Sequence, residues 1–599
     1  MSKIDEKIQQ TQHAFLVAWG QFAREKGLTE QLASVHLRQK TYQHRPQTKV
    51  LEFLVAILSG SRQLQDISLS AHPLDKDQAV AESWGQAGWA DYSGVSRTLS
   101  NLSWEEVRAI VSELERFSQP FLAGELEKLG KQKKRLTMDG DLTGIPVSNT
   151  SSSYPNAAYG HMDNEIQLGY QAGVVSLVSE TYGRLWLAGT HHPGDTVSST
   201  QAESLVLAAE SRIGLRPLRR TDLLEKRIAD YAPIVETVQK RFKTQQENAE
   251  IAQERLKQAQ IQLGEVEKEL ESVEQMYQVH QRPERPTSRL ALLRKRLLAA
   301  QQCCASRKKI VQVEKDKLAK TQARVHGVLA EINALRKRLK HFQEENQANQ
   351  QPIEAEFRLD AGFGSYANIA LLIEMGYEVY TKPHGNKTAQ ALRKKAEETS
   401  AWTKVGANAE MIVWENLQPK GSPYPLDVAL ERFYTGKTLK HSALCHFGDD
   451  PVAKDLPAWF KHYNGRQTIE AGIKESKQVF YLHRIKVRSE PAIFLQEQMT
   501  LFAANFIRWA TQWLTEQVQP QENALDLRKL GIKRQVQVGT HVSAQVIRNS
   551  DGMLLKFSDH SVFAGKVLAI PRATLPGNSQ PSRAKRFFDT LCRFLPNRI

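Results

Sequence analysis

The chain has 599 residues, several times the roughly 100–200 residues of a typical domain, so two to four structural units are expected. Lysine and arginine number 81 against 66 aspartates and glutamates, and the resulting charge of +15 favours an anionic partner such as nucleic acid. Hydrophobic residues make up 41% and charged residues 25% of the chain, which excludes both wholesale disorder and a membrane-embedded protein.

Targeting signals and cysteine spacing limit where the protein is expected to be located. The apolar run at residues 50–58 is far shorter than the roughly 20 residues that a membrane span needs. The N-terminal segment lacks the basic start and apolar block of a secretory signal, so we expect the protein to stay in the compartment where it is made. The four cysteines have no CxxC spacing, which favours reduced thiols over a disulfide framework or a zinc site.

Residues 1–125 alternate amphipathic helical segments with short polar breaks, and this pattern predicts an N-terminal all-α domain that binds DNA. Within it, Ser93 and residues 96–98 precede a second helix that starts at Ser103. That arrangement is compatible with a helix-turn-helix whose polar residues contact phosphates and base edges. An ordinary N-cap role for the same residues is the alternative.

Residues 130–219 predict the first part of an α/β core. Apolar runs at 135–147, 166–180 and 183–189 are expected to be successive strands, followed by a helix over 199–214. Residues 351–397, with a strand, a helix and another strand, predict the second part of the core. Strands followed by helix–strand alternation favour a mixed α/β sheet.

Residues 220–350 predict an antiparallel coiled-coil hairpin that interrupts this core. Apolar or small residues recur in steps of four and three from Leu224 to Tyr277 and again from Leu290 to Leu339. The proline-containing stretch at 281–287 separates the two arms, each of about fifty residues and roughly 75 Å. Two roles fit this hairpin: it could dimerise or bind DNA, or it could be a solvated spacer. The basic second arm favours DNA contact.

Three segments complete the chain. Residues 398–455 predict a β insertion, residues 456–516 the third part of the core, and residues 517–599 a β-containing C-terminal region. The last seventeen residues are basic, which suits phosphate contact or simply solubility.

Acidic residues on two predicted strands suit metal-dependent phosphodiester chemistry. Asp139 and Asp141 alternate along the first core strand and therefore project from one face. Asp360 follows apolar residues and precedes a glycine-containing turn, where a strand end opens to solvent. Each aspartate alone is equally explained as a turn or capping residue.

A third acid lies on a predicted helix of the last core segment. Tyr463, Arg466, Glu470 and Lys477 fall on one stripe of that helix at roughly 100° per residue. A solvated salt-bridge ladder is the alternative explanation of this stripe. However, carboxylates from a first strand, a later strand and a helix follow the order found in ribonuclease-H-like nucleases, which bind two Mg²⁺ ions.

These motifs together resemble prokaryotic insertion-sequence transposases of the DDE type, in particular those with a Tyr-(2)-Arg-(3)-Glu-(6)-Lys signature. The signature is complete here, DLT at Asp141 and DAGF at Asp360 match the two aspartate blocks, and the resemblance covers roughly residues 1–515. It implies a ribonuclease-H-like mixed sheet core. The long insertion between the two aspartates departs from the usual pattern, in which a large insertion follows the second one.

The resemblance also implies roles for individual residues. Asp141, Asp360 and Glu470 would be the catalytic ligands of two Mg²⁺ ions, with Mn²⁺ as a substitute, and Asp139 rivals Asp141 because both share a face. The residues that would position DNA and its phosphates are Tyr463, Arg466 and Lys477. Relatives often excise through a hairpin that needs an extruded base, and the residues that could stack on it, unless they pack in a core, are Trp402 and Trp414.

The implied activity is hydrolysis at transposon ends, followed by attack of the freed 3′-hydroxyl on target DNA. The expected partner is double-stranded DNA, the expected assembly a homodimer, and the expected location the cytoplasm of a prokaryote, at the nucleoid. Two alternatives remain: a catalytically idle architectural protein derived from a transposase, and a ribonuclease-H-like nuclease with another substrate.

Overall fold

The structure, a computed structural model, describes residues 7–40, 43–149, 154–163, 165–397, 401–517, 523–549 and 552–571. They form a mixed α/β protein that divides into two compact units. The first unit contains the described residues up to 217, residues 351–373 and those from 377 onward. The second contains residues 218–350 and 374–376.

Helices dominate the N-terminal part of the first unit. They are α1 (Ala14–Glu25), α2 (Leu28–Ser34), α3 (Pro46–Leu58), α4 (Asp66–Leu69), α5 (Gln78–Ser83), α6 (Tyr92–Ser100) and α7 (Trp104–Lys131). Buried aromatic rings join them to α16 (Glu490–Gln517): Phe121 stacks on Trp509 at 4.8 Å, and the ring centroids of Phe22 and Phe506 are 5.2 Å apart. The predicted helical region therefore packs around a helix from the far end of the chain.

The pair formed by α6 and α7 occupies the segment predicted as a helix-turn-helix. Ser103 is the N-cap of α7, and its side chain and that of Glu106 exchange hydrogen bonds with each other's backbone N–H groups. Asp91 caps α6, and Ser93 donates a hydrogen bond to Asp91. The N-cap reading is thus confirmed for Ser103, and DNA contact by this pair stays a prediction.

The prediction that residues 1–125 are all-α is wrong. Strand β1 (Lys7–Thr11) pairs antiparallel with β12 (Ala544–Asn549), in a sheet of order β1-β12-β13-β14. Strand β1 has only five residues and its partner strand lies near the opposite end of the sequence, so no local sequence pattern predicts β1. The other two strands are β13 (Gly552–Phe557) and β14 (Val567–Pro571).

The C-terminal region contains strands, as predicted, and it also contains helix α17 (Ile532–Gln537), which precedes β12. The basic C-terminal tail, whose predicted phosphate contacts were placed in the last seventeen residues, lies outside the described residues.

The central sheet is mixed and runs in the order β3-β4-β2-β6-β7-β11-β10-β9-β8, with β5 also paired to β4. Strand β2 pairs antiparallel with β4 and parallel with β6, and β6 pairs parallel with β7. The first six strands along the chain in this sheet are β2 (Leu136–Pro146), β3 (Ala158–Met162), β4 (Glu165–Ser179), β5 (Gly183–Pro193), β6 (Ala355–Leu359) and β7 (Glu378–Thr381). All predicted core strands are present, and β3 is an additional hairpin partner of β4.

Two predicted helices connect the core strands. Helix α8 (Ala202–Ile213) follows β5, and α12 (Tyr366–Glu374) connects the parallel strands β6 and β7. Because parallel neighbours need a crossover connection, α12 completes a β–α–β unit. Asp360 lies in the turn between β6 and α12, at the carboxyl edge of the sheet.

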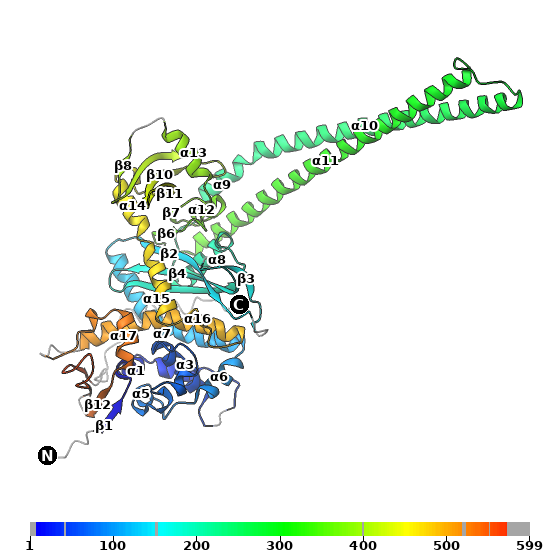
Figure 1. The fold of residues 1–599 in the computed structure, drawn as a ribbon. Helices are drawn as coiled ribbons and strands as arrows, with labels where there is room; N and C mark the ends of the chain where they lie inside the picture. The colour runs from blue at the N-terminus through cyan, green and yellow to red at the C-terminus, as the bar shows by residue number, and fades with distance from the viewer. Residues whose placement is uncertain are drawn as a thin grey trace, which may run out of the picture. The chain divides into compact units, whose positions relative to one another are not determined.

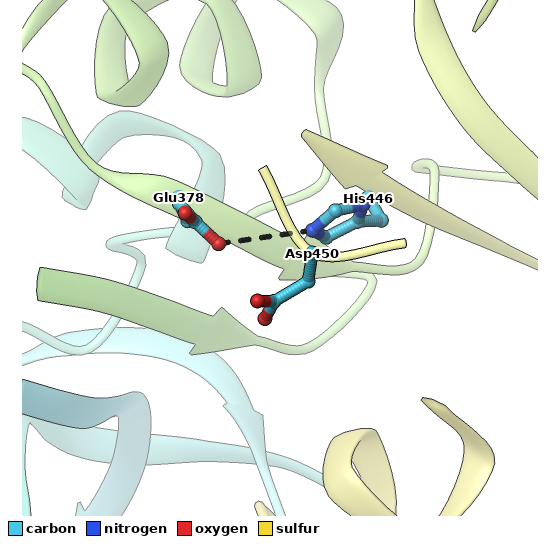
Figure 2. A group of neighbouring side chains, drawn as sticks. All are labelled: Glu378, His446 and Asp450. Atoms are coloured by element: carbon cyan, nitrogen blue, oxygen red, sulfur yellow. Dashed lines mark ion pairs between the residues drawn. The ribbon is translucent and has the colours of Figure 1, made fainter. Parts of the chain in front are cut away.

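The region predicted as a β insertion continues the same sheet. It contains β8 (Thr403–Lys404), β9 (Ala409–Leu417), β10 (Leu426–Thr435) and β11 (Thr438–Phe447), preceded by α13 (Lys387–Ala396). Strand β11 pairs antiparallel with β7. As a result Glu378 on β7 and His446 on β11 lie beside each other, with Asp450 close by (Figure 2).

The second unit consists of α9 (Thr221–Asp230) and two long helices, α10 (Ala232–Val279) and α11 (Arg289–Ala348) (Figure 1). Leu256 and Ala259 cluster with Cys304 and Val311, whereas residues nearer the connecting turn, such as Val273 and Leu293, cluster together. This pairing means that the helices are antiparallel, as predicted. Their supercoiling stays a prediction.

The base of these helices is tied by buried ion pairs. The carboxylate of Glu374 is fully buried and contacts Arg227 at 2.5 Å and Arg338 at 3.0 Å. Arg219 contacts Glu345 at 2.8 Å. Across the described residues, every helix is too short or too polar to cross a membrane.

Candidate active site

Strand register places Asp141 and Asp360 side by side. In the parallel pair β2–β6, Asp139 lies opposite Arg358 and Gly140 opposite Leu359, so the next positions are Asp141 and Asp360. Adjacent strands are about 4.8 Å apart, and residues two positions apart share a face. Both aspartates are half-buried. The two predicted strand carboxylates therefore meet at one edge of the sheet.

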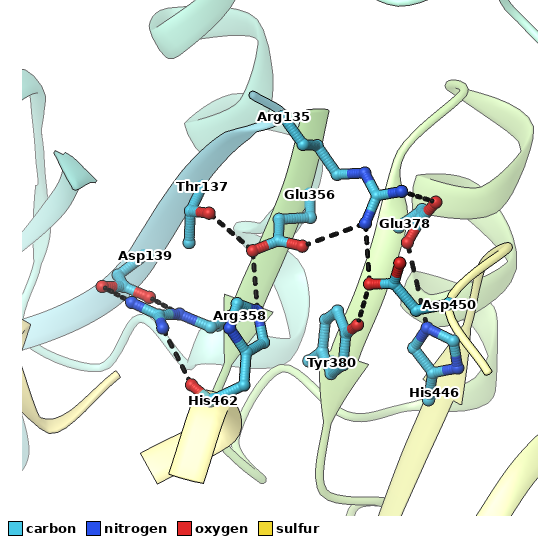
Figure 3. Close-up of polar contacts among 10 residues, drawn as sticks. All are labelled: Arg135, Thr137, Asp139, Glu356, Arg358, Glu378, Tyr380, His446, Asp450 and His462. Carbon is cyan, nitrogen blue, oxygen red and sulfur yellow. Dashed lines mark hydrogen bonds and ion pairs between the residues drawn. The ribbon is translucent and has the colours of Figure 1, made fainter. Parts of the chain in front are cut away.

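Asp139 is committed to a structural ion pair. Its two carboxylate oxygens accept hydrogen bonds from Nε and Nη2 of Arg358, at 2.7 and 2.9 Å (Figure 3). The side chain of Asp139 is fully buried and that of Arg358 is 6% exposed. Because a bidentate guanidinium occupies both oxygens of Asp139, Asp141 is the acid of this strand that is not held in such a pair.

The helix predicted to carry Tyr463, Arg466, Glu470 and Lys477 is two helices, so the single-helix prediction is wrong. Helix α14 (Leu456–Asn464) ends before Gly465, and α15 (Gln467–Gln478) begins after Arg466. Between them the backbone N–H of Arg466 bonds to the carbonyl of Tyr463, and that of Ile469 to Arg466. These three-residue bonds turn the chain more tightly than an α-helix does, which shifts Tyr463 in phase relative to Glu470.

Arg466 connects the helical acid to the sheet. Its guanidinium lies 2.5 Å from Oε1 of Glu470 and 3.7 Å from Oδ2 of Asp141. The Arg466 side chain is 11% exposed, whereas that of Glu470 is 54% exposed. Tyr463 is buried and donates a hydrogen bond to the carbonyl of Leu359, the residue before Asp360, at 3.3 Å. Three of the four signature residues therefore converge on the two aspartates.

Burial and neighbouring charges both act on the ionisation of this group. Burial, together with the carboxylates of Asp360 and Glu470, raises the pKa of Asp141 from 3.8 to about 7, although Arg466 opposes the shift. Burial disfavours the charge of Arg466, yet Tyr463 and the nearby acids outweigh it and raise the pKa of Arg466. Such a surplus of negative charge is the environment in which a divalent cation is stabilised.

Helix α15 is held against the sheet by Arg184 of β5. The Arg184 guanidinium donates to the carbonyl of Thr468 and lies 3.8 Å from Glu475, which also contacts Arg508 at 3.1 Å. Gly472 provides the room, since a Cβ at this position would lie 2.2 Å from Cζ of Arg184. The orientation of Glu470 thus depends on a glycine two residues further along the helix.

Gly472→Ala is expected to destabilise the protein by about 1–3 kcal/mol, because the added methyl group overpacks a buried, ion-paired arginine. Urea unfolding of the variant measures this change. Gly124→Ala in α7 is the matched control, since open space surrounds that position and alanine should stabilise the helix by about 0.5–1 kcal/mol. A Gly472→Ala variant as stable as the control would contradict the proposed fit.

The remaining predicted residues lie apart from the three acids. Lys477, near the end of α15, pairs with Asp163 in the β3–β4 turn at 2.9 Å. Trp402 and Trp414 are half-buried; Arg432 lies 4.0 Å over the ring of Trp402, and Lys395 lies 5.6 Å over that of Trp414. Each tryptophan keeps part of its ring exposed, so stacking on a base stays a prediction for both.

The donor set fits Mg²⁺. Carboxylate oxygens are hard ligands, and Asp141, Asp360 and Glu470 offer them without a sulfur or imidazole donor from the same group. Sequence reasoning missed the two arginines that shape this site. Arg358 could have been found, since it alternates with Asp360 along β6 and so shares its face. For Arg184 the sequence contains no comparable signal.

Comparison with models of protein families gave no match, and comparison with curated protein sequences gave no similar protein. The site is therefore argued from its own geometry and from the motifs that it contains.

Proposed function

We propose that the protein is a DDE-type DNA transposase that cuts at transposon ends and joins the freed 3′-hydroxyls to target DNA. The observation that carries this proposal is the meeting of Asp141, Asp360 and Glu470, from two adjacent strands and a helix, around Arg466. Pure DNA binding has no need of such a group, since carboxylates repel phosphates.

The strand order of the central sheet supports the proposal of a ribonuclease-H-like core. The strands β5-β4-β2-β6-β7 lie in the order expected of such a core, with three antiparallel strands followed by two parallel ones. The first acid lies on the central strand β2 and the second at the end of its parallel neighbour β6. Helix α15 brings the third acid to β2 from outside the sheet.

The chemistry follows from these residues. Two Mg²⁺ ions bound by the three carboxylates would activate water or a 3′-hydroxyl and stabilise the leaving oxygen. Arg466 is placed to neutralise a phosphate at the same edge, because it already lies between Asp141 and Glu470. The buried Tyr463 fixes the end of α14 against the strand that precedes Asp360. Double-stranded DNA as partner, a homodimer as assembly and the nucleoid as location belong to this proposal.

Strand cleavage tests the proposal. The purified full chain is incubated with DNA that carries the inverted repeats flanking its reading frame, in Mg²⁺, Mn²⁺ or Ca²⁺. We expect cutting in Mg²⁺ and Mn²⁺ and a gel shift without cutting in Ca²⁺. Glu470→Gln should abolish cutting and keep the gel shift, because the exposed Glu470 side chain contributes little to the fold. Glu105→Gln, at an exposed glutamate of α7, is the control that should still cut.

An idle architectural protein is the second candidate. The ion pair between Arg466 and Glu470 favours this candidate, because the guanidinium already neutralises a carboxylate that a metal ion would otherwise bind. A specific gel shift without cutting in any metal, unchanged by Glu470→Gln, would support that candidate and contradict the transposase. Cleavage of a junction or of RNA in preference to the element's ends would instead support a ribonuclease-H-like nuclease of another kind.

A further inference from the structure

A second group of metal-ligating side chains lies where β7 meets β11. Glu378 comes from β7, His446 from β11 and Asp450 from the loop that follows β11. One possible ligand atom of each lies within 4.8 Å of those of the other two (Figure 2). None of the three belongs to the proposed catalytic group.

The imidazole of His446 is oriented as a metal ligand requires. Its Nδ1 lies 3.3 Å from Oδ2 of Asp427, and in a metal-bound imidazole this carboxylate would accept the Nδ1 proton while Nε2 binds the ion. That Nε2 atom is buried, lacks a hydrogen-bond partner in the described chain and lies 3.9 Å from Oε2 of Glu378. Oε2 of Glu378 is likewise buried and unpartnered there. Two buried ligand atoms therefore face each other across a distance too long for a hydrogen bond.

The carboxylates of Glu378 and Asp450 each have one oxygen fixed by neighbouring side chains. Arg135 contacts Oε1 of Glu378 at 2.6 Å and Oδ2 of Asp450 at 2.8 Å, and Tyr380 donates to the same Asp450 oxygen at 2.6 Å (Figure 3). These contacts use one oxygen of each acid and leave the other for an ion. Hydrogen-bonded carboxylates and a carboxylate-bound histidine are the usual outer shell of a metal site.

The charges of this network also favour the binding of a cation. Arg135 is shared by three carboxylates, those of Glu356, Glu378 and Asp450. Glu378 and Asp450 therefore share one guanidinium, and a bound cation would pair with the carboxylate oxygens that Arg135 does not contact.

We propose that Glu378, His446 and Asp450 bind a divalent transition-metal ion of the Zn²⁺ class, separate from the catalytic Mg²⁺ ions. The imidazole nitrogen favours Zn²⁺ and its neighbours in the transition series over Mg²⁺, which prefers oxygen. The ion ties β7 and β11 to the loop that leads into α14. Since α14 carries Tyr463, the site stabilises the approach to the catalytic edge and goes beyond the proposed function.

Cobalt is the probe that tests this site. The full chain is titrated with Co²⁺ in excess Mg²⁺, which occupies oxygen-only sites, and visible d–d absorption reports bound Co²⁺. We expect one Co²⁺ per chain with a tetrahedral or five-coordinate spectrum, displaced by one equivalent of Zn²⁺. Asp450→Asn and His446→Gln should lose this band, and Asp427→Asn should weaken binding about 10- to 100-fold.

Two controls separate this site from others. Asp449→Asn, an exposed neighbour of Asp450, and Asp141→Asn in the catalytic group should both keep the band unchanged. If His446→Gln fails to fold, Asp450→Asn decides the matter, because the Asp450 side chain is 44% exposed and its loss is better tolerated. Absence of the band in the folded wild-type chain, or equal Co²⁺ affinity in Asp450→Asn, would overturn the proposal.

Discussion

Asp141→Asn is expected to cut DNA on the order of 10³-fold more slowly than the wild type while folding more stably above neutral pH. The rate falls because a lost metal ligand removes several kcal/mol of transition-state stabilisation. The stability rises because folding buries the Asp141 carboxylate, brings it next to Asp360 and Glu470 and thereby raises its pKa from 3.8 to about 7. The residue that we propose as a metal ligand therefore weakens the metal-free fold.

The sign of the pH dependence follows from that shift. The folded state holds the Asp141 proton more tightly than the unfolded state does, so this group costs stability progressively as the pH rises from about 4 to about 7. Asparagine does not ionise and escapes this cost, which at pH 8 is at most about 4 kcal/mol for a shift of this size.

Urea unfolding of the metal-free proteins at pH 8 and pH 5 measures the difference. The advantage of Asp141→Asn should shrink at pH 5, and Mg²⁺ should stabilise the wild type more than the variant. Should the variant be less stable than the wild type at pH 8, or gain equally from Mg²⁺, the proposed crowding of the three acids would be wrong.

Asp139→Asn is expected to destabilise the protein by about 3–5 kcal/mol, because it leaves the buried guanidinium of Arg358 without its counter-charge. The expected result is the opposite of that for Asp141→Asn, although the two aspartates share one strand face. Chemical unfolding measures the loss. DNA cutting per folded molecule, measured well below the unfolding transition, should remain, because we propose Asp141, and not the ion-paired Asp139, as the metal ligand.

A double-mutant cycle isolates this ion pair. Asp139→Asn combined with Arg358→Gln replaces both charges by hydrogen-bonding amides and should be less destabilised than the sum of the single variants. Glu105→Gln, which breaks the exposed pair with Arg38, is the surface control and should change stability by less than about 1 kcal/mol. Loss of cutting in a folded Asp139→Asn protein would instead make Asp139 a ligand.

Local pattern was sufficient for much of the core. Apolar runs bounded by turn residues located β2, β4 and β5, and the steps of four and three located α10 and α11. The alternation of Asp139 and Asp141 placed both on one face, which their shared β2 register bears out. These successes concern residues close in sequence, where period alone decides the structure.

Features that depend on distant partners were not predictable in this way. The ion pair of Asp139 with Arg358 joins residues more than two hundred positions apart, and β1 depends on β12. The break at Gly465 was hidden because its backbone angles stay in the right-handed helical region and only the hydrogen bonds tighten. If one helical period is assumed across such a break, the residues beyond the break are assigned to the wrong face of the helix.

The pairing of β1 with β12 also has a consequence for biosynthesis. Residues 7–11 leave the ribosome long before their partner strand, which is translated more than five hundred residues later. At 5–20 residues per second, that delay is roughly half a minute to two minutes. During this time the nascent N-terminal segment carries an unpaired edge, so a chaperone that shields short extended segments would raise the yield of active protein most when translation is slow.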